Sequence, residues 1–196
     1  SAVAILAALI VFLFLNLSAK DGKGDFVLAA EEVSVYNAVP SDAVVVVDLK
    51  HAGEYATITG DTLSFLYGLP LAGDPLVELQ RELADIDAIS GAPMVFSLHY
   101  SAKNSVSFLQ IMDLKNGGVQ DVQNLLSSKG LSRKRYSGTV VHTLDKGVVA
   151  ALHNNLFLAS SSSHVLESSV RHLENSTSIL DKPEFEKLLR KNGTSS

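Results

Sequence analysis

The chain begins with an apolar run that no polar residue interrupts. Every residue from Ala2 to Leu15 is apolar, and Lys20 is the first charged residue. As a helix that rises about 1.5 Å per residue, residues 2–19 would reach about 27 Å, close to a hydrocarbon core of roughly 30 Å. The pattern predicts a single transmembrane helix, an uncleaved signal anchor, at residues 1–19. The lipid bilayer is then the partner of residues 2–19.

Two other interpretations of this run stay open. Leu17-Ser18-Ala19 partly matches a small-x-small cleavage site, so the run could be a cleaved signal peptide. The other interpretation is a helix buried in the core of the protein. Lys20 and Lys23 follow the run and argue mildly against export under the positive-inside rule. A short N-terminal stub before a large polar domain usually leaves that domain outside. We therefore expect a single-pass cell-membrane protein whose domain faces the periplasm or the exterior.

A charged, glycine-rich stretch separates the apolar run from the rest, and we interpret residues 20–38 as a linker. Val39-Pro40-Ser41-Asp42 then indicates a turn, and the β-branched run 43–49 is typical of a strand. Residues 39–196 are thus expected to form one exoplasmic domain. Because the chain lacks an initial Met and stops just after a helix, we expect a fragment of a longer protein, with the domain truncated at its C-terminus.

Periodicity along residues 39–196 predicts an α+β domain. Apolar residues at steps of three and four indicate helices at 75–89, 119–129, 165–173 and from Asp181 onward, where Asp181 is the expected N-cap, with shorter helices near 52–58 and 62–67. Alternating or continuous apolar runs indicate strands at 43–49, 94–100, 106–114, 135–136, 139–144, 148–152 and 156–160. This order predicts a mainly antiparallel sheet with helices packed on one face.

Composition narrows the possible functions. The chain has 196 residues, 16 Lys+Arg against 21 Asp+Glu, a net charge of −5 and no Cys. The missing Cys excludes disulfides, thiolate metal sites and a cysteine nucleophile. An acidic chain argues against broad nucleic-acid binding, which needs clustered Lys and Arg. We expect no nucleic-acid partner.

A search for catalytic and ligand-binding motifs identifies none. No histidine is followed by another at two, three or four residues, and no zinc-protease, nucleophile-elbow, P-loop or dinucleotide motif occurs. We therefore assign no catalytic, cofactor-binding or metal-ligating residue. An enzyme site assembled by the fold from dispersed residues such as His99, His142, Asp48 and serines is the alternative. It requires these side chains to converge in a pocket. The six histidines are His51, His99, His142, His153, His164 and His172.

The serine run, the basic cluster and two sequons have structural interpretations that need no catalytic or binding site. The Ser160–Ser163 run is placed to cap a helix, and Ser132-Arg133-Lys134-Arg135 is expected on a hairpin surface. Contact of this basic cluster with anionic lipid or an envelope polymer is the alternative. Asn175-Ser176-Thr177 and Asn192-Gly193-Thr194 match the glycosylation sequon, a short motif that by itself carries little weight.

Four segments, at 38–47, 136–142, 156–173 and 180–185, resemble parts of a family of exported, membrane-anchored bacterial proteins that is defined only as a domain of unknown function. The opening 38–47 is similar to its Pro-Ser-Asp start and first strand, and 136–142 resembles its Tyr-x-Gly hairpin. The segments 156–173 and 180–185 resemble its closing strand, helix and Phe-containing pattern. The likeness covers about residues 38–190. It implies an N-terminal anchor and an exoplasmic α+β domain, and it supplies no catalytic residues.

The sequence as a whole favours a membrane-anchored bacterial envelope protein. We expect its domain to be a binding or scaffolding module without an evident catalytic site, whose protein or envelope-polymer partner the sequence does not name. The alternatives are the envelope enzyme described above and a secreted soluble domain released by signal cleavage, in which case the mature chain would begin near Lys20.

Overall fold

The computed structural model of the chain describes residues 35–49, 91–102, 105–114 and 117–193, together with the single positions Leu79, Leu83, Ile86 and Ile89. The predicted anchor at 1–19 and the short helices predicted near 52–58 and 62–67 lie outside these residues. Within the described part of the chain, no helix has the length and apolar character needed to cross a membrane.

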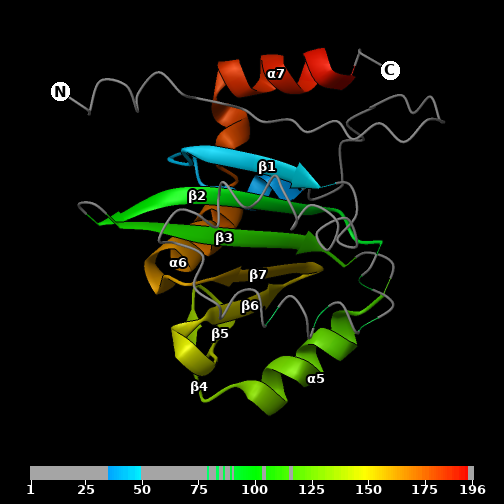
Figure 1. Cartoon of the computed structure of the whole chain (residues 1–196), viewed down its shortest axis with the longest axis vertical. Coiled ribbons are helices and arrows are strands. Elements are labelled where there is room, and N and C mark those ends of the chain that lie inside the picture. Colours follow the sequence, from blue (N-terminus) through cyan, green and yellow to red (C-terminus); the bar gives the residue numbers. More distant parts are fainter. Residues whose placement is uncertain are drawn as a thin grey trace, which may run out of the picture.

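Seven strands form a single antiparallel sheet, which confirms the predicted α+β class and the antiparallel pairing. Along the sheet the order is β1-β2-β3-β7-β6-β5-β4, so β7 lies in the middle, between the β1–β3 and β4–β6 halves (Figure 1). The strands are β1 Val45–Leu49, β2 Met94–Ala102, β3 Ser105–Asp113, β4 Ser132–Tyr136, β5 Thr139–Thr143, β6 Val149–His153 and β7 Leu156–Ser160.

Three α-helices and three short 3₁₀ helices accompany the sheet in the described residues. They are α5 Val119–Lys129, α6 Ser163–Glu174, α7 Pro183–Gly193, η1 Val35–Ala38, η4 Asp145–Gly147 and η5 Ile179–Asp181. The side chain of Ser162 accepts a hydrogen bond from the Val165 N–H and caps α6, as expected for the serine run. Asp181 does not act as predicted: its carboxylate accepts from the Ser178 N–H at 2.9 Å and closes the capping box of η5.

Helices cover both faces of the sheet, so the prediction that they pack on one face is wrong. On one face, which we call the α5 face, Phe157 and Ala159 of β7 join the core that contains Val122 and Leu126 of α5. On the opposite α6 face, Leu156 and Leu158 join the core that contains Val165 and Leu166 of α6. Every residue of β7 is buried. Successive side chains of a strand alternate between faces, so an uninterrupted buried strand needs cover on both sides.

The folded domain includes the last residues of the predicted linker. Val35, Tyr36 and Ala38 of η1 are buried in the core of the α6 face. The ring of Tyr36 lies edge-on to Phe185 of α7, with ring centroids 5.6 Å apart. Helix α7 lies at the β1 end of the sheet, far from α5 (Figure 1). The linker predicted over 20–38 therefore overlaps the domain from Val35 onward.

Candidate functional site

The candidate site lies where β5 and β6 stop pairing. Their register runs from Thr143–Val149 to Val141–Ala151 and ends there. On its outer side β5 stays paired with β4 as far as Thr139, and β6 stays paired with β7 as far as His153. Both strands are thus held by their outer neighbours while the ladder between them is interrupted. This leaves an opening at the end of the sheet that carries the β4–β5 and β6–β7 turns.

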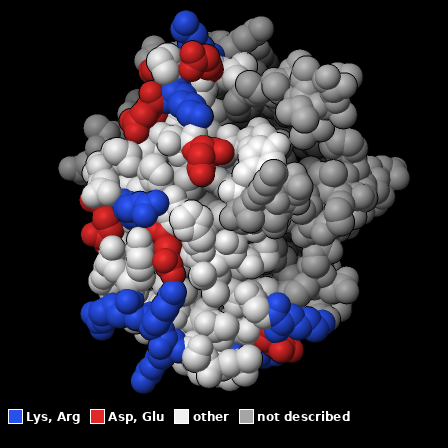
Figure 2. Space-filling model, turned by 90° about the vertical axis from the view of Figure 1, so that its left-hand side faces the viewer, with Lys and Arg blue, Asp and Glu red and all other residues white. Residues whose placement is uncertain are grey.

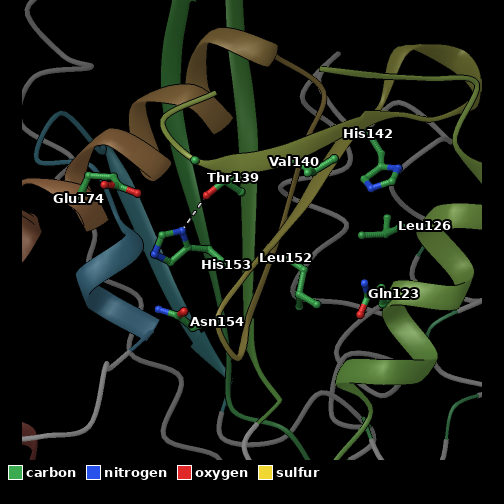
Figure 3. Close-up of a pocket in the computed structure, with 10 residues that line it drawn as sticks. Gln123, Leu126, Thr139, Val140, His142, Leu152, His153, Asn154 and Glu174 are labelled. Atoms are coloured by element: carbon green, nitrogen blue, oxygen red, sulfur yellow. Dashed lines mark hydrogen bonds between the residues drawn. The ribbon is translucent and has the colours of Figure 1, made fainter. Parts of the chain in front are cut away.

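A cleft of about 450 Å³ occupies this end of the sheet. Figure 3 shows that its lining divides into two ends with Leu152 between them. One end, which we call the hairpin end, contains Glu174 of α6 and residues beside the two turns. The other, which we call the α5 end, contains two residues of α5. The hairpin end is lined by Glu174, Gly138, Thr139, His153 and Asn154, and the α5 end by Val140, His142, Gln123 and Leu126.

A side-chain hydrogen bond spans the gap between the strands at the hairpin end. Thr139 Oγ1 lies 2.8 Å from His153 Nδ1, at the position where the interrupted ladder would have continued (Figure 3). Thr139 is buried and His153 is half-buried. Beside them, Gly138 and Asn154 adopt positive φ angles of 78° and 54° in the two turns. These conformations suit Gly and Asn and let each chain reverse directly at the cleft.

His142 dominates the α5 end. It is half-buried, and burial together with the positive charge of Arg133 holds the pKa of its imidazole below the usual value. The chain after α5 packs directly against it: a Cβ at Gly130 would lie only 2.9 Å from His142 Nδ1. The ring is therefore fixed between β5 and the end of α5. A neutral imidazole held in this way can donate or accept a hydrogen bond in the cleft.

The basic cluster predicted on a hairpin surface forms β4, the exposed edge strand beside β5. Arg133, Lys134 and Arg135 are all exposed. Figure 2 shows Lys and Arg side chains close together near the lower end of the molecule, where β4 lies in Figure 1. Lys134 forms an ion pair with Glu167 of α6. The surface position expected for this cluster is confirmed, although the strand begins at Ser132 and not at 135.

The side chains of the alternative enzyme hypothesis do not converge. The Asp48 carboxylate accepts a hydrogen bond of 2.5 Å from Tyr36 Oη on the α6 face, beside η1. His99 lies toward the other end of β2, because Asp48 pairs with Val95. His142 lies on β5 at the far end of the sheet and on the opposite face from Val141 of the α6 core. These three residues therefore share no pocket, and the site proposed from them is wrong.

His99 nevertheless forms a Ser-His-Asp hydrogen-bond chain within the core. Its Nε2 lies 2.8 Å from Ser97 Oγ, and its Nδ1 lies 3.0 Å from Asp42 Oδ1. The order matches that of a nucleophile, base and orienting acid. The exposure is reversed, because Ser97 and His99 are each 1% exposed whereas the Asp42 side chain is 70% exposed. A serine enclosed in this way cannot meet a substrate, so the chain of bonds serves the structure.

The remaining predicted residues are scattered. His164 is exposed near the start of α6, His172 bonds Thr177 Oγ1 through Nδ1 at 2.7 Å, and His51 lies outside the described residues. Of the two sequons, Asn175 lies exposed at the C-cap of α6, and the second continues beyond the described residues. In the described part of the chain, no three His, Asp or Glu side chains gather as a metal site would need.

Sequence reasoning did not identify the cleft. It named His142 only for the enzyme site with His99 and Asp48 and His153 only among the six histidines, and it gave no functional role to the other polar lining residues, Thr139, Asn154, Gln123 and Glu174. One signal was present: Thr139 and His153 are equidistant from the β5–β6 connection, so a hairpin register places them opposite each other. The interruption of the ladder has no comparable pattern in the residues.

Comparison with known proteins identifies no protein that is similar to this chain. No protein-family model matches the chain, and no curated protein or solved structure is significantly similar to it. The resemblance of residues 38–190 to a domain of unknown function therefore stays a prediction.

Proposed function

We propose that this domain is a binding module for a small polar molecule and that the cleft at the end of β5 and β6 is its site. The observation that carries this proposal is the cleft itself, in which two imidazoles, two carboxamides, a hydroxyl and a carboxylate surround an apolar strip. Its volume lies within the roughly 300–1,000 Å³ typical of small-molecule sites. A few convergent polar groups on an apolar floor give orientation and specificity to such sites.

Binding explains the cleft better than catalysis does. Thr139 and His153 are hydrogen-bonded, as the nucleophile and the general base of an enzyme would be. No third side chain of the described residues is bonded to His153 to orient it, and Thr139 is almost completely buried at 6% exposure. The pair is well placed to hold the two strands at a fixed distance and to present the free imidazole nitrogen to a ligand. We therefore assign the Thr139–His153 pair a structural role in the site and not a catalytic one.

The second part of the proposal concerns location. The apolar run at residues 2–19 would tether the domain to a bacterial cell membrane, with the cleft on the exoplasmic side. Support comes from the sequence pattern alone. Carbonate extraction of membranes containing the full-length protein tests this: the anchor predicts release only by detergent. Release by carbonate alone would show a peripheral or secreted protein and would remove the tether from the proposal.

The cleft is tested with four chemically distinct probes. The full chain, labelled in its histidines and held in a neutral detergent, is titrated with inorganic phosphate, succinate, ethanolamine and glucose at constant ionic strength. The imidazole NMR signals of His142 and His153 report on the cleft, and the exposed His164 is the reference. We expect at least one probe to shift the cleft signals saturably while His164 stays constant. If all four leave both signals unchanged, the cleft is not a site for small polar molecules.

A further inference from the structure

We infer that the α5 end of the cleft binds an oxyanion, the carboxylate or phosphate group of a small soluble molecule, through Arg133 and Arg135 at its rim together with His142 and Gln123. This inference rests on the proposed binding function and names the chemical class of the ligand. It follows from the register of the edge hairpin, the pairing of its charges and the distribution of charge along the cleft.

The register places both arginines beside the cleft. Arg133 pairs with His142, and Arg135 pairs with Val140. Residues paired directly across two antiparallel strands point to the same face, with Cβ atoms about 5 Å apart. Since His142 and Val140 line the α5 end, the two arginine side chains rise from the neighbouring strand on that same side. The effect of Arg133 on the pKa of His142 is consistent with this proximity.

The basic side chains of β4 differ in their ion pairs on the two faces of the strand. Lys134 points to the α6 face, where Glu167 neutralises it. For Arg133 and Arg135, no carboxylate of the described residues forms an ion pair. Two guanidinium groups with free donors thus stand at one rim of the cleft. Guanidinium groups bind carboxylates and phosphates through paired hydrogen bonds, whereas a lysine acts as a single point charge.

The cleft is also polarised along its length. Among the described residues that line it, Glu174 is the one charged residue and belongs to the hairpin end, whereas His142 and the Gln123 amide belong to the α5 end (Figure 3). An anionic group would be repelled by Glu174 and attracted to the arginines, which fixes its direction in the cleft. The hairpin end, with Asn154 and His153, is left for uncharged or cationic parts of the ligand. The volume suits a molecule with one such group and not an extended polymer.

The positive charge of β4 has a second physical role that the test must separate. Charged side chains on an edge strand prevent pairing with strands of other molecules, and all three basic residues can do this. Protection of the edge makes no distinction between the two faces of β4. Anion binding at the α5 end does, because Arg133 and Arg135 lie on the same face as that end and Lys134 does not.

The experiment compares charge removal on the two faces. The full chain, its Arg133→Gln/Arg135→Gln double variant and its Lys134→Gln variant are titrated with inorganic phosphate and with succinate at constant ionic strength, using the His142 signal. All three changes lie on exposed side chains, so we expect the fold to be retained. We expect the double variant to lose at least about tenfold in affinity, as for lost charge-assisted bonds. The Lys134→Gln variant should stay within about twofold.

The outcomes separate this inference from the proposed function. If ethanolamine or glucose shifts the cleft signals and neither anion does, the cleft binds ligands and the oxyanion inference is overturned. If phosphate binds but Lys134→Gln weakens it as much as the double variant, the attraction is diffuse and the inference is again overturned. If no probe shifts the signals, the inference fails together with the binding function.

Discussion

Tyr36 Oη donates a hydrogen bond of 2.5 Å to Asp48 Oδ2, and this bond joins η1 to β1 across the α6 face. Burial, followed by the neighbouring Asp48 charge, raises the pKa of the Tyr36 phenol, so the hydroxyl keeps its proton.

Tyr36→Phe removes the donor while Asp48 stays half-buried. We expect the free energy of unfolding in urea to fall by about 1–3 kcal/mol. Tyr136→Phe, which removes a hydroxyl from a half-buried tyrosine at the other end of the sheet, is the control and should change it by less than about 0.5 kcal/mol. Equal effects of the two changes would show that the Tyr36–Asp48 bond contributes nothing.

His99 should make the domain less stable in mild acid. Burial lowers the pKa of its imidazole; Asp42 opposes this effect, and His172 adds to it. The unfolded chain takes up a proton near pH 6.5, whereas the folded chain takes it up only at lower pH. The contribution of His99 is thus complete above pH 6.5 and decreases as the pH falls toward the folded pKa, by at most about 1.4 kcal/mol per pH unit.

Urea unfolding between pH 7.5 and 5.5 measures this dependence. His99→Gln should make the slope smaller, because one of the two described histidines whose pKa is lowered is gone, whatever the change does to stability at pH 7.5; His142 keeps its own contribution. His164→Gln, at an exposed position, should leave the slope as it is in the parent chain. A parent slope that survives in His99→Gln would assign the acid sensitivity to other groups.

Gln110 is a polar residue placed in an apolar core. It is fully buried on the α5 face, its Nε2 points to Met94 Sδ at 3.4 Å, and its Oε1 has no hydrogen-bond partner in the described part of the chain. An unsatisfied buried oxygen costs about 1–3 kcal/mol. Gln110→Met, similar in length, should therefore raise the melting temperature or leave it unchanged. Gln120→Met on the exposed side of α5 is the control, and a marked loss of stability in Gln110→Met alone would show that Oε1 has a partner.

The sequence predicted those parts of the fold that have a local pattern. The alternating run at 94–100 and the apolar run at 106–114 correspond to β2 and β3, and the helix predicted at 119–129 corresponds to α5. The strand β4 was predicted two residues long, because Ser132-Arg133-Lys134 carries no apolar signal on an edge that is exposed on both faces. The helix layer on the second face was not predicted. The apolar run 156–159 indicated a strand, but the pattern of the helices did not show which face of the sheet each one would cover.

The candidate site could not be predicted in the same way. Its residues come from α5, β5, β6 and the end of α6, which are brought together only by the order of strands in the sheet. The decisive feature is the interruption of the β5–β6 ladder beyond Val141 and Ala151. Whether two strands pair to their ends depends on the packing of both outer neighbours, and single residues such as Thr139 or Leu152 carry no sign of it.

Gly130 should be required for space and not for its backbone conformation. Its φ of −67° is accessible to any residue, but a Cβ there would lie 2.7 Å from the Leu126 carbonyl oxygen and 2.9 Å from His142 Nδ1. Gly130→Ala should lower the free energy of unfolding by about 1–3 kcal/mol and displace the His142 signal. Gly91→Ala is the matched control, since a Cβ added there would have nothing within 4 Å and the φ of Gly91 is not positive. If both alanines are tolerated equally, the end of α5 adjusts freely and does not fix the His142 ring.

Arg133 should control the protonation of His142 from the neighbouring strand. Burial is the larger cause of the low pKa of His142, and the guanidinium of Arg133 is the second. Arg133→Gln should therefore raise this pKa without restoring it to the ordinary value, as measured from the imidazole NMR shifts during a pH titration. Lys134→Gln removes the same charge one residue away on the opposite face and should raise it less. Added salt should reduce the difference between the parent chain and Arg133→Gln, because the interaction between a half-buried ring and an exposed guanidinium is partly screened. Equal responses to the two substitutions would mean that His142 senses the net charge of β4 and not its neighbour in the register, which would also weaken the case for a directional anion site.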